Sequence, residues 1–214
     1  MALITELILA RHGEAHCNVA GVVGGPRTCT GLTGVGRDQV ACLATRLSAE
    51  HTLNRPIDAL YSAPRRRVAE TGQILAERLT LRAHSDSGLD GPEHGDADGR
   101  AWLDVKTAFA GPPSARPDRP YAQGAETWNR YLDRATAYLG ELLDRHTGQR
   151  VLLACHSETI AAAHALLLGL PPQDRGRVGF VTDHASITRW QQHRNRFGRT
   201  QWMLAVHNDT AHLS

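Results

Sequence analysis

Two apolar runs in this chain each end on a histidine. Residues 3–10 read LITELILA and lead into Arg11 and His12, while residues 151–155 read VLLAC and lead into His156. Apolar runs of this length are typical of central strands that helices cover on both faces. Because α/β folds carry their chemistry at the carboxyl ends of such strands, we expect these polar side chains to meet, although 144 residues separate the two histidines.

Strand-like and helix-like segments alternate along the chain. Apolar residues recur at three- and four-residue steps after Thr33, which is expected to cap a helix, and again after Pro64, which is expected to open one. This alternation predicts an α/β three-layer sandwich with a mostly parallel central sheet. The expected strands are 3–10, 57–63, 151–155, 178–193 and 199–207, and the expected helices are 33–50, 64–79, 126–146 and 157–169.

Residues 82–124 interrupt this alternation. They are rich in Gly, Pro, Asp and His, and we expect a long irregular excursion with one short helix over 101–109. An excursion of this length in a compact domain is usually a lid or a specificity loop. With 214 residues, the chain is expected to form one domain over 1–214.

The composition bears on the classes of partner. The net charge is +2 and 41% of the residues are hydrophobic, so there is no bulk electrostatic reason to expect a nucleic acid or an anionic membrane. No apolar run reaches the roughly eighteen residues that span a bilayer. Four cysteines without a CxxC pair, and an amino end without a leader pattern, predict a reduced, cytoplasmic protein. A homo-oligomer is neither predicted nor excluded.

Arg11 and His12 have the chemistry for phosphoryl transfer. A histidine with one ring nitrogen held by a carbonyl presents the other as a fixed lone pair, which is a competent nucleophile at neutral pH without a metal. An adjacent arginine supplies a fork that matches two phosphate oxygens. The pair is therefore a candidate phosphate site, with His12 as the nucleophile.

Four motifs stand in order along the chain: Arg11-His12-Gly13-Glu14 with Asn18, TGLTGVGRDQ at 30–39, YSAPRRRVAETG at 61–72 and VLLACHSETI at 151–160. Together they resemble the phosphoglycerate-mutase-like histidine phosphatases. The resemblance implies that fold and a two-step reaction without cofactor or metal, in which His12 attacks phosphorus and water later releases phosphate from the phosphohistidine. It also implies that the transferring group is held by Arg11, Arg67 and His156, and that the substrate is bound by Gly13, Asn18 and Ser157.

The same alignment makes Arg67, rather than Arg65 or Arg66, the second catalytic arginine. Two of these three side chains are expected to point to solvent as an ordinary charged face. Cations near a helix amino end are electrostatically unfavourable, which hints that an anion binds nearby.

The acid that protonates the leaving oxygen departs from the family pattern. Family members usually carry it in a pattern like Leu-x-Glu-x-x-x-Gly, and the stretch LDGPEHG at 89–95 puts Gly91 at the acid position. We predict Glu93 as the acid, with Asp90 and Asp96 as the alternatives. A carboxyl group in this role needs a raised pKa, which burial beside the leaving group provides.

The predicted function is a phosphatase acting on a small phosphorylated metabolite. A mutase of the same family is one alternative, although residues 82–124 offer few basic groups to hold a bisphosphate. A phosphate-binding module without turnover is another, because of Gly91. A zinc hydrolase that uses His12 and His16 is a third, if that stretch were helical. Aromatic residues of the excursion and its flank could cover an organic leaving group, namely Trp102, Phe109, Tyr121 and Trp128.

Overall fold

A six-stranded sheet organises the structure, a computed structural model that describes residues 1–52 and 55–214. The strand order is β3-β2-β4-β1-β5-β6. The first four of these pair in parallel and the last two pair antiparallel, so the prediction of an α/β fold with a mostly parallel sheet is confirmed. The strands are β1 Ala2–Arg11, β2 Ala59–Ser62, β3 Ala83–Ser85, β4 Arg150–Cys155, β5 Ile187–Arg194 and β6 Thr200–Asp209.

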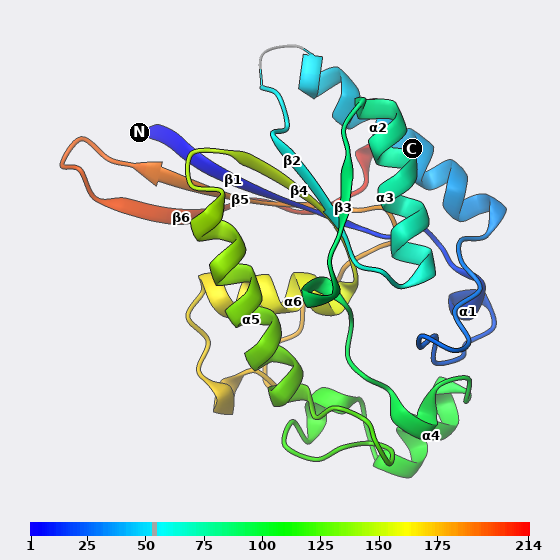
Figure 1. Ribbon diagram of the computed structural model, residues 1–214. Helices are drawn as coiled ribbons and strands as arrows, with labels where there is room; N and C mark the ends of the chain where they lie inside the picture. Colours follow the sequence, from blue (N-terminus) through cyan, green and yellow to red (C-terminus); the bar gives the residue numbers. More distant parts are fainter. Residues whose placement is uncertain (53–54) are drawn as a thin grey trace.

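Helices cover both faces of this sheet. In Figure 1, α2 and α3 lie together on one face, and α5 and α6 lie together on the other. The short helix α4 stands away from the sheet, beyond the ends of the strands. The helices are α1 His16–Val19, α2 Gly34–Thr52, α3 Arg66–Leu79, α4 Trp102–Phe109, α5 Trp128–Arg145 and α6 Ser157–Leu167.

The predicted cap of α2 is confirmed. Thr33 Oγ1 accepts a hydrogen bond from the Gly36 N–H over 2.9 Å and lies 2.7 Å from the Glu14 carboxylate. The first bond satisfies a backbone donor that the helix itself cannot pair. The second ties the start of α2 to the loop that follows β1. The cap therefore helps to hold that loop in place.

The register between β1 and β4 determines where the two histidines lie. Arg11 pairs with Cys155 across the parallel ladder, and the His12 N–H donates to the Cys155 carbonyl over 3.0 Å. The central residues of both strands are fully buried in the main hydrophobic core. Because both strands end at the same edge, His12 and His156 leave the sheet side by side.

Three segments differ from the sequence prediction, one of them the four-residue helix α1, which was not expected. Residues 178–186 were expected to begin a long strand, but the strand β5 starts only at Ile187. Residues 178–186 form an irregular, largely exposed segment. Their apolar side chains resemble those of a strand, but among the described residues the segment pairs with no other strand of the sheet. The three-residue edge strand β3 was not predicted, because it is too short to show a period of two. The helix expected within the excursion is confirmed as α4.

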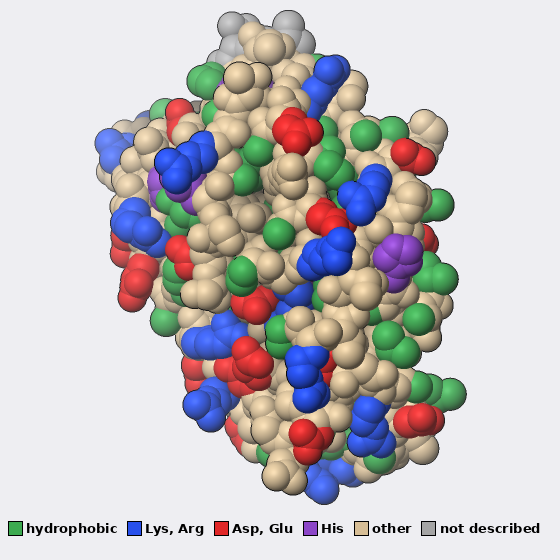
Figure 2. Space-filling view, turned by 45° about the vertical axis from the view of Figure 1, so that its right-hand side comes forward, with side chains coloured by type: hydrophobic (Ala, Val, Ile, Leu, Met, Phe, Trp, Pro, Cys, Tyr) green, Lys and Arg blue, Asp and Glu red, His purple; other side chains and the backbone are tan. Residues whose placement is uncertain are grey.

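The outer surface carries both signs of charge. Figure 2 shows one face of the molecule, on which Lys and Arg side chains are interspersed with Asp and Glu. Within the described ranges, none of the helices has the length and apolar character that a bilayer-crossing helix needs.

Candidate active site

His12 lies at the carboxyl end of β1 and is almost fully buried. Its Nδ1 lies 2.7 Å from the Gly13 carbonyl oxygen, and its Nε2 accepts a hydrogen bond from Nε of Arg67 over 3.1 Å. Because Arg67 can only donate, Nδ1 carries the ring hydrogen and Nε2 carries the lone pair. Burial, and then the charges of Arg67, His156 and Arg11, lower the pKa of His12 well below its ordinary value, so the ring is neutral at neutral pH.

Gly13 is required by the close approach of two backbones. A Cβ at this position would run into the Gly36 carbonyl, and a Cβ at Gly36 would run into the Glu14 carbonyl. The crossing brings the first turn of α2 against the loop after β1. Since the Gly13 carbonyl holds Nδ1 of His12, this packing fixes the orientation of the imidazole.

Arg67 joins the two histidines. It lies in the first turn of α3 and is 8% exposed. Besides donating to His12, it donates from Nη1 to the Gly24 carbonyl over 2.7 Å and from Nη2 to Nδ1 of His156 over 3.2 Å. The two imidazole centroids are 5.6 Å apart. Arg67 therefore presents a permanent positive charge between two neutral rings.

Arg65 is buried as well, which corrects the prediction that two of the three arginines point to solvent. Its side chain is fully enclosed and its Nη2 lies 3.2 Å from the Asp90 carboxylate. The other oxygen of Asp90 lies 3.4 Å from Nε2 of His156. Only Arg66 is exposed, because the start of α3 faces the loop that carries Asp90. Arg65 and Asp90 therefore support His156 from the side opposite to Arg67.

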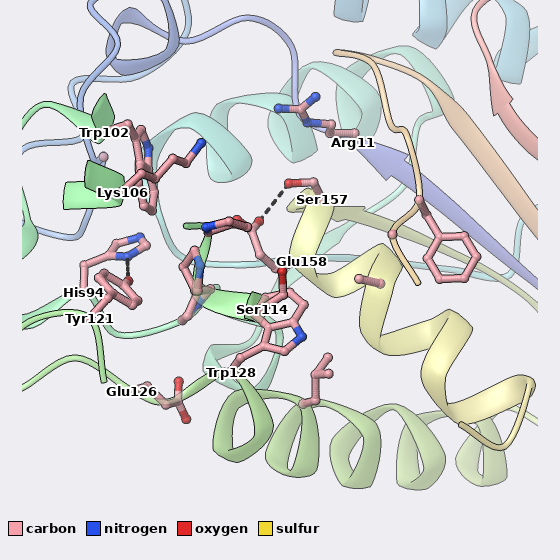
Figure 3. A pocket seen from close by; sticks show the side chains of 18 of the residues that line it. Arg11, His94, Trp102, Lys106, Ser114, Tyr121, Glu126, Trp128, Ser157 and Glu158 are labelled. Carbon is pink, nitrogen blue, oxygen red and sulfur yellow. Dashed lines mark hydrogen bonds between the residues drawn. The ribbon is translucent and has the colours of Figure 1, made fainter. Parts of the chain in front are cut away.

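Arg11 completes the cationic lining. Its Nη1 donates to the Thr182 carbonyl over 2.5 Å, and its buried Nε has no partner among the residues that the structure describes. Figure 3 shows the guanidinium above the cavity, on the side of Ser157. An N–H group left unpaired in a buried position is costly unless something binds it. Arg11 therefore has donor capacity to spare for an anionic ligand.

Glu93, predicted as the acid, does not line the cavity. Its side chain is exposed, and its backbone pairs with Glu126, whose N–H donates to the Glu93 carbonyl over 2.8 Å. Asp96 is exposed too. Gly91 is buried, and a Cβ there would lie 3.2 Å from both Arg65 and the His156 ring. The position that should carry the acid therefore faces His156 without a carboxylate.

Glu158 is the carboxylate that sequence reasoning missed. It lies in the first turn of α6, lines the cavity and accepts a hydrogen bond from the Ser157 hydroxyl over 2.9 Å (Figure 3). Burial raises its pKa, but His156, its own backbone N–H, Ser157 and Arg67 outweigh burial and lower the pKa below the ordinary value. The sequence contained one indication of this role: Glu158 follows His156 by two residues, at the amino end of an expected helix, where a negative charge is favoured.

Two further histidines stand close to the site. His184 has its ring centroid 5.7 Å from that of His12, and His94 lines the cavity with its Nδ1 2.5 Å from the Tyr121 hydroxyl. Burial, followed by nearby arginines, lowers the pKa of each to about 4. Both rings are therefore neutral at neutral pH and add no charge to the site.

These residues surround a cavity of about 450 Å³. The predicted catalytic and substrate-binding residues that line it are Arg11, His12, Asn18, Arg67 and Ser157. Of the aromatic residues expected over the leaving group, Trp102, Tyr121 and Trp128 line the cavity and Phe109 does not. His156 lies behind Arg67, and Asn18 uses its Oδ1 to accept from the Ala15 N–H over 3.0 Å. In the described part of the chain, no group of three His, Cys, Asp or Glu side chains is arranged to hold a metal ion.

The arrangement can be compared with families of known proteins. The Histidine phosphatase superfamily (branch 1) matches residues 7–208. This chain belongs to the histidine phosphatase superfamily.

Several relatives of this histidine phosphatase carry named activities. Phosphoserine phosphatase 1 of Hydrogenobacter thermophilus is 27% identical over 197 residues, which cover 90% of this chain and 90% of that protein. Glucosyl-3-phosphoglycerate phosphatase of Mycolicibacterium vanbaalenii is 27% identical over 225 residues, 99% of this chain and 97% of that protein. A solved mycobacterial glucosyl-3-phosphoglycerate phosphatase in complex with VO3 matches with a TM-score of 0.79 at 25% identity, covering 97% of this chain and 99% of that one.

The comparisons confirm the resemblance drawn from the motifs. The histidine phosphatase fold extends over nearly the whole chain, and relatives of similar length are named phosphatases. The protein is a phosphoric monoester hydrolase of the histidine phosphatase type.

Proposed function

We propose that this histidine phosphatase hydrolyses a small phosphomonoester through a phosphohistidine on His12, without a metal ion. One observation carries the proposal: Arg67 contacts Nε2 of His12 and Nδ1 of His156 at once, and both Arg67 and His12 line the cavity. A phosphate seated there would face a neutral imidazole and a guanidinium whose N–H groups can turn from the imidazole to the phosphoryl oxygens. This is the arrangement that in-line phosphoryl transfer requires.

In the first step, Nε2 of His12 forms a bond to phosphorus while the bond from phosphorus to the leaving oxygen breaks. Arg11 and Arg67 neutralise the charge on the phosphoryl oxygens, since both guanidinium groups face the cavity. His156 lies behind Arg67, between that guanidinium and Asp90, and is proposed to contact the same oxygens when Arg67 turns toward the phosphate. Gly13 orients His12, while Asn18 and Ser157 line the phosphate end and are proposed to bind the substrate.

For the proton that the leaving oxygen needs, we propose Glu158 in place of Glu93. Glu158 lines the cavity, whereas Glu93 is exposed outside it. Glu158 is ionised in the empty site, but a bound phosphate dianion compensates Arg67 and repels the carboxylate, which raises the carboxyl pKa so that it takes up a proton. That proton passes to the leaving oxygen as its bond to phosphorus breaks.

In the second step, water attacks the phosphohistidine. The ionised Glu158 takes a proton from the water as its oxygen bonds to phosphorus, and the bond from phosphorus to Nε2 of His12 breaks. As phosphate leaves, the pKa of Glu158 falls back and its proton passes to solvent, so both side chains return to their starting state. A mutase would have to retain the phosphohistidine in contact with a bisphosphate. Phosphatase is favoured over that alternative, since relatives of similar length are phosphatases by name.

A cytoplasmic location is proposed with this function. All four cysteines are free, as expected in a reducing compartment. The partner expected is a small phosphorylated metabolite.

The experiment is phosphate release from p-nitrophenyl phosphate and from alkyl and sugar phosphates, with EDTA present, by the unmodified protein and by His12→Ala. We expect release that EDTA leaves unchanged and that His12→Ala abolishes. Release that survives in His12→Ala would exclude His12 as the nucleophile. The loss of release on adding EDTA would contradict the metal-independent reaction and return weight to a zinc hydrolase.

A further inference from the structure

The cavity continues well past the phosphate end. Beyond Glu158 its wall is built mainly from apolar side chains on α5, on α6 and on the segment that follows α6, which also contributes Arg175. We name this part the distal compartment, and its members are Trp128, Leu132, Ala161, Ala165, Leu170 and Phe180.

One face of α6 connects the two ends of the cavity. Ser157, Ala161 and Ala165 are four residues apart, so their side chains line up along the same side of the helix. Ser157 stands next to His156 at the phosphate end. The two alanines that follow have side chains too short to fill the space over the helix. The small residues therefore leave a continuous path from the phosphate end into the distal compartment.

The compartment is covered by two segments that meet over it. A Cβ at Gly176 would lie 2.5 Å from the Ser114 carbonyl oxygen, so the segment after α6 touches the turn at 113–115 of the excursion. Leu170 and Phe180 flank this contact in the sequence and line the cavity below it. The cover keeps water away from part of the apolar wall, which strengthens apolar binding there.

The charged side chains around the compartment already have partners. Glu126 is paired with Arg134 over 2.9 Å, and Arg175 with Asp133 over 2.5 Å. The ammonium of Lys106 lies 5.4 Å from the centre of the Trp102 ring, which attracts a cation through its π-face. A zwitterionic leaving group would therefore find few free charges in the compartment, while an apolar one would find a ready surface.

We propose that the distal compartment binds an extended apolar group, so that the preferred substrates are phosphomonoesters of large apolar alcohols or phenols. The proposal rests on the phosphatase reaction at His12 and adds the chemistry of the leaving group. A cavity of about 450 Å³ is within the range of sites that enclose an organic ligand, and a phosphoryl group fills only a small share of it. The apolar wall supplies binding free energy in proportion to the area it covers.

The test is a series of straight-chain alkyl phosphates, from ethyl to octyl. Their leaving alcohols have almost the same acidity, so differences in kcat/KM report binding of the chain rather than ease of bond breaking. We expect kcat/KM to rise about fourfold for each methylene that enters the compartment. O-phosphoserine, with its two charges, should be turned over less well than butyl phosphate.

The variant Ala161→Phe tests whether the alkyl chain binds along α6. A phenyl ring at 161 should close the path along α6, so the ratio of kcat/KM for octyl phosphate to that for ethyl phosphate should fall to about one. Ala137→Phe makes the same exchange on the exposed side of α5, outside the cavity, and should leave the rise intact. Turnover of ethyl phosphate by Ala161→Phe also reports that the variant is folded.

The outcomes separate the two proposals. No rise with chain length in the unmodified protein, or a preference for O-phosphoserine, overturns the apolar compartment while the phosphatase reaction still stands. A rise that Ala161→Phe leaves unchanged overturns the placement along α6. A failure to turn over any ester refutes the reaction at His12 itself, whatever the compartment binds.

Discussion

Nε of Arg67 donates a hydrogen bond to Nε2 of His12 over 3.1 Å, against the lone pair proposed to attack phosphorus. The ring nitrogen behind it, Nδ1, is 2.7 Å from the Gly13 carbonyl. Both ring nitrogens of the imidazole are thus held before the substrate binds. No free energy is therefore spent on orienting the ring during the reaction. Arg67 must release this lone pair and turn its N–H groups to the phosphoryl oxygens when phosphate binds.

We expect Arg67→Lys to lower kcat/KM about 100-fold. Lysine keeps the positive charge but loses the planar fork that contacts His12, His156 and Gly24 together, and electrostatic groups of this kind contribute on that scale. Steady-state kinetics with p-nitrophenyl phosphate measures the loss. Arg66→Lys, on the exposed neighbour in the same turn, is the control and should retain full activity. Equal losses in the two variants would mean that the helix start, rather than Arg67, is at fault.

Glu158→Gln should slow the hydrolysis of alkyl phosphates about 100-fold or more while sparing p-nitrophenyl phosphate. A nitrophenolate leaves without a proton, whereas an alkoxide does not, so only the alkyl esters depend on the acid. Glu93→Gln is the matched control, since both variants remove one carboxylate. An acid role for Glu93 would instead give the leaving-group effect in Glu93→Gln and none in Glu158→Gln.

Asp90→Asn should destabilise the fold by about 2 to 4 kcal/mol, measured by urea unfolding. Asp90 is the carboxylate partner of the fully enclosed Arg65, and its loss leaves a buried charge uncompensated. Asp133→Asn removes the carboxylate of the Arg175 pair, where the acid is 65% exposed, and should change stability by less than about 1 kcal/mol. Similar losses in both variants would contradict the burial of the Arg65 pair.

Acidification should destabilise the protein before its carboxylates are protonated. The pKa of His94 is lowered to about 4 from an ordinary 6.5, so between these values the unfolded chain binds a proton that the folded one does not. Its contribution to stability is complete above about pH 6.5 and is lost as the pH falls toward about 4.

His94→Gln should therefore flatten the fall in unfolding free energy between about pH 6.5 and pH 4 by about 2 to 3 kcal/mol. Glutamine can still bond the Tyr121 hydroxyl, and His16→Gln on an exposed side chain is the control. Denaturation with urea at several pH values provides the measurement. An unchanged slope in His94→Gln would show that the buried imidazole is not involved.

Much of the site's framework was predictable from the sequence. The two apolar runs marked β1 and β4, and their parallel register puts His12 and His156 at one edge of the sheet. The helical spacing after Pro64 indicated α3, and the motif alignment singled out Arg67 within it. The positions of these residues could be predicted because they lie at the ends of regular strands and helices, whose periodicity and boundaries are visible in the sequence.

Other features depend on contacts that no local pattern reveals. Arg65 looks like a solvent-facing charge in the sequence. In the structure its side chain is fully buried and pairs with Asp90, which lies in a loop further along the chain. Glu158 looks like an ordinary first-turn carboxylate, and only the cavity gives it a further role. The apolar segment before β5 resembled a strand, but it runs along the cavity wall instead of pairing.

The most direct test of the account is to trap the reaction intermediate. The protein is mixed with p-nitrophenyl phosphate in EDTA, quenched rapidly, kept at alkaline pH, where phosphohistidine survives, and digested for mass spectrometry. We predict one added phosphoryl group on His12, absent from His12→Ala and present in Arg66→Lys. Turnover without any phosphoryl group on His12, or a phosphoryl group on another residue, would contradict the central claim.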